Sequence, residues 1–127
     1  MKDLFVPYEQ SLELRELGFD EICLTHYWGN DILNEAYGGW MKNSNTKYVM
    51  SPTWEQTFKW FRDNYNLIGL VEGGYDNGKN IFTYVIWDGF KDNMIDEYFD
   101  TYEEAQLKCL IQLKCLVQLI KIRKENG

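Results

Sequence analysis

Few residues in this chain carry the chemistry that catalysis requires. His26 is the only histidine, so any mechanism in which an imidazole activates a serine or cysteine nucleophile must use it. On a strand, Cys23 lies three residues from His26 and points to the opposite face, so the two cannot form a nucleophile–base pair locally. Cys109 and Cys115 could approach His26 only through the fold. We therefore expect His26 to be a half-buried, hydrogen-bonded structural residue.

The cysteines do not indicate a metal site. Cys23, Cys109 and Cys115 include no Cys-x-x-Cys spacing, and a single histidine adds little to such a ligand set. Cys109 and Cys115 are six residues apart, which places them on different faces of a helix. This pattern is typical of reduced, partly buried thiols in a cytosolic protein. We predict no catalytic residue, no metal ion and no cofactor.

A run of carboxylates is the second group of residues that could take part in chemistry or binding. It could hold a hard cation, or present a negative face to a basic partner such as a host protein that normally binds nucleic acid. The alternative is the solvated edge of a sheet followed by the start of a helix. Spacing alone singles out no carboxylate pair for acid–base catalysis. The run comprises Asp88, Asp92, Asp96, Glu97, Asp100, Glu103 and Glu104.

Charge divides the chain into an acidic body and a basic end. The 127 residues include 13 basic and 20 acidic side chains, for a net charge of −7. Residues 1–104 carry eight basic and nineteen acidic side chains, whereas residues 105–127 carry five and one. An acidic body repels phosphate, so generic binding of DNA or RNA is disfavoured. Aromatic residues make up 17% of the chain, which argues against disorder.

The elements that position these residues begin with a short helix. Pro7 suits its first position, and Gly18 suits the left-handed residue that follows a helix. Residues 22–28 are rich in β-branched and aromatic side chains and predict a strand. Residues 29–46 form the least regular stretch, and loops of this length are often functional. Residues 47–50 predict a short strand that pairs back to 22–28.

The second half of the chain has clear start and turn signals. Thr53 predicts a helix start, with Gln56 as the reciprocal partner of a capping box. Strands are predicted at 67–72 and 80–88, around a turn at 73–79 that contains Asn-Gly. The second of these strands is apolar on both faces, so it should be a central strand covered on both sides.

A more polar strand at 94–99 and a helix at 101–124 complete the predicted elements. Thr101 and Glu104 form a second capping box at the start of that helix. The order of elements favours a single domain, residues 1–127, of the α+β class. We expect a mainly antiparallel sheet of three to five strands, packed by three helices that include the long C-terminal one.

The last helix contains an internal repeat, in which Gln106–Ile111 is followed by the similar Gln112–Val117. Six residues rotate a helix by roughly 240°, so the two copies face different ways and the helix is apolar all round. Either the domain covers both faces, or one face binds a second chain. We predict the second, a homodimer, with several exposed residues on the outer flank. These are drawn from Leu113, Leu116, Val117, Leu119 and Ile120.

Three segments resemble a known group of proteins. They read Val6-Pro-Tyr with Leu14-x-x-Leu-Gly-Phe-Asp-Glu21, then Ser51-Pro-Thr-Trp-Glu-Gln-Thr-Phe-Lys-Trp-Phe-Arg62, then Thr101-Tyr-Glu-Glu-Ala-Gln-Leu-Lys-Cys-Leu110. They resemble short uncharacterised proteins encoded by phages and prophages of gut Bacteroidales. That family has no assigned activity, so the resemblance transfers no catalytic residue. It implies a protein that works in the cytoplasm of an infected or lysogenic bacterium.

Two functional hypotheses follow. The first is a small interaction protein that self-associates through its C-terminal helix and binds a host or phage protein, with Asp92, Asp96 and Glu97 as an acidic contact face. The second is a small enzyme or ligand-binding domain, with a site between the sheet and the 29–46 loop. The N-terminal residues show no signal peptide and no run approaches a membrane span, so we expect a soluble protein. The residues of the second hypothesis are His26, Tyr27, Trp28, Tyr37 and Trp40.

Overall fold

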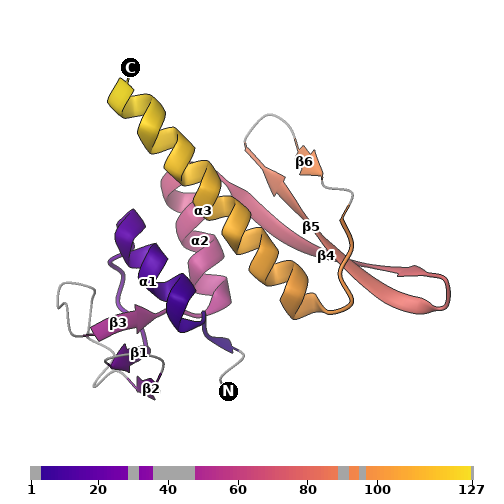
Figure 1. Ribbon diagram of the computed structural model, residues 1–127, viewed down its shortest axis with the longest axis horizontal. Helices are drawn as coiled ribbons and strands as arrows, with labels where there is room; N and C mark the ends of the chain where they lie inside the picture. Colours follow the sequence, from indigo (N-terminus) through magenta and orange to yellow (C-terminus); the bar gives the residue numbers. More distant parts are fainter. Residues whose placement is uncertain (1–3, 29–31, 36–47, 89–91, 95–96, 127) are drawn as a thin grey trace. The chain divides into compact units, whose positions relative to one another are not determined.

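The described part of the chain forms helices and antiparallel strands in the order drawn in Figure 1. A computed structural model describes residues 4–28, 32–35, 48–88, 92–94 and 97–126. The elements are α1 (Tyr8–Leu17), β1 (Thr25–Trp28), β2 (Ile32–Glu35), β3 (Tyr48–Ser51), α2 (Trp54–Tyr65), β4 (Ile68–Asp76), β5 (Lys79–Trp87), β6 (Asp92–Met94) and α3 (Tyr102–Asn126).

The contacts between residues divide the chain into two units, Met1–Thr57 and Phe58–Gly127. The boundary between the two units falls inside α2, and the single domain of residues 1–127 remains a prediction. The predicted α+β class and the long C-terminal helix are confirmed. The single sheet of three to five strands is not confirmed, because the strands are divided between two small sheets of order β2-β1-β3 and β4-β5-β6.

In the first unit, β1 lies between its two neighbours. It pairs antiparallel with β3, with Tyr27 opposite Val49, as the sequence predicts. It also pairs with β2, where Tyr27 lies opposite Leu33. β2 falls inside the stretch 29–46 that the sequence analysis leaves irregular, and most of that stretch lies outside the described residues.

Helix α1 ends in the way that its sequence predicts. Gly18 has a left-handed φ of 107°, and its N–H donates to the Arg15 carbonyl at 3.0 Å. The N–H of Phe19 donates to the Leu14 carbonyl at 3.0 Å, which completes a Schellman cap. Pro7 precedes the helix instead of opening it. The cap folds Phe19 back into the core, where it is almost fully buried.

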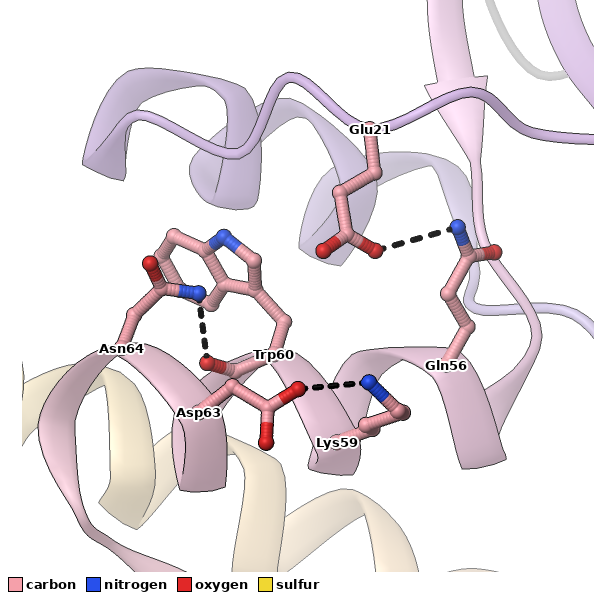
Figure 2. Close-up of polar contacts among 6 residues, drawn as sticks. All are labelled: Glu21, Gln56, Lys59, Trp60, Asp63 and Asn64. Carbon is pink, nitrogen blue, oxygen red and sulfur yellow. Dashed lines mark hydrogen bonds and ion pairs between the residues drawn. The ribbon is translucent and has the colours of Figure 1, made fainter.

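Helix α2 begins with half of the predicted capping box. The N–H of Gln56 donates to Thr53 Oγ1 at 3.1 Å. The Gln56 side chain does not return to Thr53: its Nε2 donates to the Ile22 carbonyl at 2.9 Å and to Glu21 Oε1 at 3.3 Å (Figure 2). In this position the amide nitrogen of Gln56 donates two hydrogen bonds, one to a carboxylate and one to a backbone carbonyl. Gln56 therefore ties the segment before β1 to the first turn of α2.

The later turns of α2 belong to the second unit. Lys59 and Asp63 form an exposed ion pair of 2.6 Å one turn apart, and Asn64 Nδ2 donates to the Trp60 carbonyl at 3.0 Å (Figure 2). Such an exposed pair stabilises a helix only slightly. The Trp60 ring is buried.

Strands β4 and β5 form a longer hairpin than predicted. Asn77 and Gly78 have φ angles of 51° and 81°, which suit a tight two-residue turn. Because this turn needs no further residues, the ladder runs out to the pair Asp76 and Lys79. The predicted turn at 73–79 is therefore wrong at both ends, since residues 73–76 and Lys79 belong to the strands.

The expectation that β5 is covered on both sides is confirmed for part of its length. Tyr84, Val85 and Ile86 are consecutive and all buried. Side chains alternate between the faces of a strand, so both faces are covered at this point. The strand lies between β4 and β6 in its sheet.

The segment that leads to α3 differs in part from its prediction. The strand expected at 94–99 is replaced by the shorter β6 and by a separate bridge in which Phe99 and Phe82 exchange backbone hydrogen bonds of 2.7 and 2.9 Å. Half of the capping box predicted at the start of α3 forms, with Glu104 accepting from the Thr101 hydroxyl and not from its backbone N–H. Thr101 Oγ1 accepts from the N–H of Glu104 at 3.1 Å and donates to its carboxylate at 3.1 Å.

Gly69 fixes how α3 meets the sheet of the second unit. The helix packs along β4 and β5 (Figure 1). A Cβ atom on Gly69 would lie 2.8 Å from Cys109 Sγ and 3.1 Å from Leu113 Cδ1. Side chains do not approach that closely without displacement, so this position requires a glycine. The close approach turns Cys109 and Leu113 toward the strands.

Candidate functional site

One face of α3 is packed within the chain. Its buried residues recur at helical spacing and, at about 100° per residue, occupy about half of the circumference. Two of them are polar: Gln106 is 9% exposed and Lys114 is 5% exposed. Lys114 is therefore a charged residue on the packed face of the helix. The residues of this face are Ala105, Gln106, Cys109, Leu110, Leu113, Lys114 and Val117.

The opposite side of α3 carries apolar residues that the chain does not cover. Leu119 is 49% exposed, Ile122 is 51% exposed and Cys115 is exposed, while Ile111 is partly exposed. Their spacings of four, four and three residues place them in one line along the helix. We call Ile111, Cys115, Leu119 and Ile122 the exposed stripe; it is roughly 16 Å long.

The structure sorts the predicted outer flank into three groups. Leu113 and Val117 are fully buried, so they do not belong to an exposed face. Leu116 and Ile120 are partly buried. Leu119 is exposed as expected. The repeat makes the helix apolar all round, and nothing in the repeat itself tells which side meets the sheet.

Three residues of the exposed stripe are not among the predicted outer-flank residues: Ile111, Cys115 and Ile122. The sequence holds a signal for all three, because steps of four residues back from Leu119 reach Cys115 and Ile111, and a step of three residues forward reaches Ile122. The alignment of the stripe residues identifies an exposed face only when the buried face is known, and the contact of Gly69 with Cys109 and Leu113 shows which face that is.

Exposed charges of opposite sign lie at the two ends of α3. Glu103 and Glu104 occupy its first turn, and Arg123 and Lys124 its last turn. Acidic side chains interact favourably with the positive N-terminal end of the helix dipole, and basic side chains with its negative C-terminal end. By helical spacing, Glu104 is in line with Ile111 and Arg123 is in line with Leu119, so the exposed stripe has an acidic end and a basic end. Glu103 and Lys124 are instead in line with the buried Leu110 and Val117.

The acidic run does not gather into one described site. Asp100 binds Lys79 through an exposed ion pair of 3.1 Å. Glu97 is exposed, and its carbonyl accepts a hydrogen bond of 2.8 Å from Thr83 Oγ1. Asp92 begins β6, and Asp96 lies outside the described residues. Within the parts of the chain that are described, no group of three or more potential ligands is placed to hold a metal ion.

The structure describes only part of the alternative pocket. His26 and Tyr27 are both buried, but as neighbours on β1 they point to opposite faces. Trp28 ends the strand, and Tyr37 and Trp40 lie outside the described residues. Because side chains alternate along a strand, His26 and Tyr27 cannot line the same face. Their adjacency in the sequence already implies this.

Tyr27 has a structural role instead. Its hydroxyl donates to the carbonyl of Val6 at 3.0 Å. Ser11 Oγ and Ser51 Oγ donate to the same oxygen at 3.0 and 2.9 Å. The Val6 N–H donates to the Pro52 carbonyl at 2.9 Å. Three hydroxyl groups thus hold one buried carbonyl and connect the N-terminal segment to α1, β1 and β3.

Two of the three thiols are unsuited to nucleophilic chemistry. Burial raises the pKa of Cys109 to about 12. Burial, with a smaller contribution from the Glu21 carboxylate, raises the pKa of Cys23 to about 12. Both are therefore protonated at neutral pH, and a protonated thiol is a poor nucleophile. The predicted placement of Cys109 and Cys115 on different faces is confirmed, because Cys115 is exposed.

Burial lowers the pKa of His26 below its ordinary value. The unfolded chain then binds a proton more readily than the folded one, so the folded state loses stability as the pH falls below the unfolded pKa. We predict that His26→Gln lowers the free energy of unfolding by about 0.5–3 kcal/mol near neutral pH. The variant should lose less stability than the wild type between about pH 7.5 and pH 5.

Thermal unfolding at several pH values measures this difference. Met50→Leu is the matched control, since Met50 lies opposite His26 in the β1–β3 ladder and does not titrate. Equal acid sensitivity in the wild type and in His26→Gln would contradict the effect of burial. Any binding activity of the protein should remain within a few-fold of wild type in His26→Gln, because we assign His26 a structural role.

No family model, curated protein sequence or solved structure matches this chain. Among the described residues, no helix is both long enough and apolar enough to cross a membrane.

Proposed function

We propose that this chain is a non-enzymatic interaction protein that self-associates through the exposed stripe of α3. The observation that supports this function is the pair Leu119 and Ile122, each about half exposed beside Cys115 on the face opposite the packed one. Covering the exposed half of a leucine or isoleucine side chain contributes about 1 kcal/mol. A second copy that presents the same stripe doubles the number of covered side chains.

The rest of the molecule is consistent with this function. The two buried thiols are protonated, and His26 and Tyr27 lie on opposite faces of their strand. The resemblance to phage and prophage proteins adds a setting, the cytoplasm of a bacterial host, and a second partner, a host or phage protein. The acidic body of residues 1–104 would meet a basic surface on that partner.

The test is the molar mass in solution. Light scattering on size-exclusion eluates should show wild-type mass rising toward that of a dimer from about ten to several hundred micromolar, the range expected of a small interface. The double variant Leu119→Glu with Ile122→Glu should remain a monomer at every concentration, because it places charge on the stripe. Its circular dichroism should match the wild type, since both residues are half exposed.

The control adds the same charge elsewhere. Leu70 and Tyr75 on β4 are 46% and 73% exposed, so Leu70→Glu with Tyr75→Glu changes two exposed apolar residues away from α3. This control should associate like the wild type. A monomeric wild type throughout the concentration range, or dissociation of the control to the same extent, would overturn the proposal.

A further inference from the structure

We infer that two copies of the chain pair their α3 helices antiparallel, about a two-fold axis that passes beside Cys115. This inference rests on the proposed function and adds the orientation and register of the contact. In an antiparallel pair related by a two-fold axis, residues equally far from the axis in opposite directions meet. The sequence around Cys115 can therefore be tested for that symmetry.

The exposed side of α3 is nearly symmetric about Cys115. Ile111 lies four residues before it and Leu119 four residues after it. Gln112 and Gln118, both exposed, lie three residues to either side. With the axis at Cys115, Ile111 packs against the partner's Leu119, and the same contact occurs twice. The small cysteine at the axis allows the helices to approach closely.

The outer part of the stripe fits the same register. Ile122 lies seven residues after Cys115, and the exposed Lys108 lies seven residues before it. The long apolar stem of a lysine can cover an isoleucine while its ammonium group stays in water. An axis shifted by two residues, beside Val117, would place the partner's Arg123 over Ile111 and would bring a charge onto the apolar contact.

Charge selects the antiparallel orientation over the parallel one. With the axis at Cys115, the partner's Arg123 lies level with Leu107, about one helical turn from Glu104. A parallel pair would instead set carboxylates beside carboxylates and cations beside cations. The helix dipoles are also opposed only in the antiparallel arrangement. The occupant that complements both ends of the stripe is therefore a second copy of the same helix.

Cross-linking through cysteine tests the register in the intact protein. At a concentration where light scattering shows the dimer, a short homobifunctional maleimide should join Cys115 to the partner's Cys115. The buried Cys23 and Cys109 react slowly because they are protonated. Cys115→Ser should therefore reduce the yield of covalent dimer by roughly tenfold.

Orientation is tested by moving the thiol within the Cys115→Ser background. Leu119→Cys alone should cross-link poorly with itself, because the two thiols are separated by about 12 Å along the helix pair. A mixture of the Leu119→Cys and Ile111→Cys proteins should cross-link efficiently, because those two positions meet. The light-scattering mass of each variant is measured first, and each must dimerise before it is cross-linked.

The outcomes separate this inference from the proposed function. A wild-type dimer in which Leu119→Cys joins to itself as efficiently as Cys115 does would show parallel helices and overturn the inference, while the proposed function stands. A wild-type dimer that Cys115 does not cross-link would also overturn the inference. A wild-type monomer at all concentrations would remove the proposed function itself.

Discussion

Replacing Leu113 with alanine should lower the free energy of unfolding by about 2–5 kcal/mol, whereas the same change at Leu119 should cost less than about 0.5 kcal/mol. The two leucines hold the same place in successive copies of the repeat. Leu113 is fully buried, and its Cδ1 atom lies 3.1 Å from where a Cβ of Gly69 would be. Leu119 is 49% exposed, so its truncation leaves no cavity.

Urea denaturation followed by circular dichroism measures both variants. It should be carried out at a protein concentration low enough that the chain is monomeric, so that any cost of dissociation does not add to the value for Leu119→Ala. Leu107→Ala provides a third point from the same repeat position, with a partly buried side chain and an intermediate cost. Equal costs at Leu113 and Leu119 would show that both faces of α3 are buried alike.

The local elements were predictable because their signals are local. The left-handed Gly18, the Thr53 cap of α2, the turn at Asn77 and Gly78 and the Thr101 cap of α3 all form as expected. Each depends on the conformational preference of one residue, or on a hydrogen bond over three or four residues. Strand bounds were predicted less well: the β4–β5 hairpin continues to its turn, and β6 with a separate bridge replaces the strand expected at 94–99.

The arrangement of strands was not predictable in the same way. A strand pattern gives no partner, so the sequence could not tell whether 22–28 and 80–88 share a sheet. The pairing of β1 with β2 is made by residues inside a stretch that looks irregular. Two three-stranded sheets satisfy the same patterns as one larger sheet. Pairing between distant segments decides between these arrangements.

The candidate surface was predicted in part for a related reason. Apolar residues surround α3, so hydrophobic periodicity does not define a buried side. The choice depends on one glycine about forty residues earlier, since Gly69 lets Cys109 and Leu113 approach the strand. Once that face is fixed, the helical repeat gives the exposed stripe directly. Side-chain polarity does not identify the buried face either, because the charged Lys114 lies on it.

Deleting Gln112–Val117 should convert the protein to a monomer while most of its fold survives. The deletion moves every later residue of α3 back by six positions. Leu119 then takes the buried place of Leu113, and Ile120 takes that of Lys114. Arg123 replaces Val117 near the new end of the helix, where a long side chain can reach water. We expect a loss of about 1–3 kcal/mol in stability for this last exchange.

The same shift removes the exposed stripe. Lys121 takes the place of Cys115, and Glu125 takes the place of Leu119, so two apolar residues of the stripe become charged. The place of Ile122 lies beyond the end of the shortened chain. Charges in the middle of a small interface are not compensated by the remaining Ile111, and burying them without partners is costly. Association should therefore be lost even at several hundred micromolar.

Light scattering on size-exclusion eluates, together with thermal unfolding, measures the two effects of the deletion separately. The matched control is the full-length double variant Cys115→Lys with Leu119→Glu, which makes the same surface change without shortening α3. Both proteins should be monomers, and the double variant should melt close to the wild type. If the deletion is monomeric and the double variant still dimerises, association depends on the length of α3 or on another surface. If the deletion unfolds, the residues that move into the buried positions do not restore the core, because the second copy of the repeat is needed within its own chain.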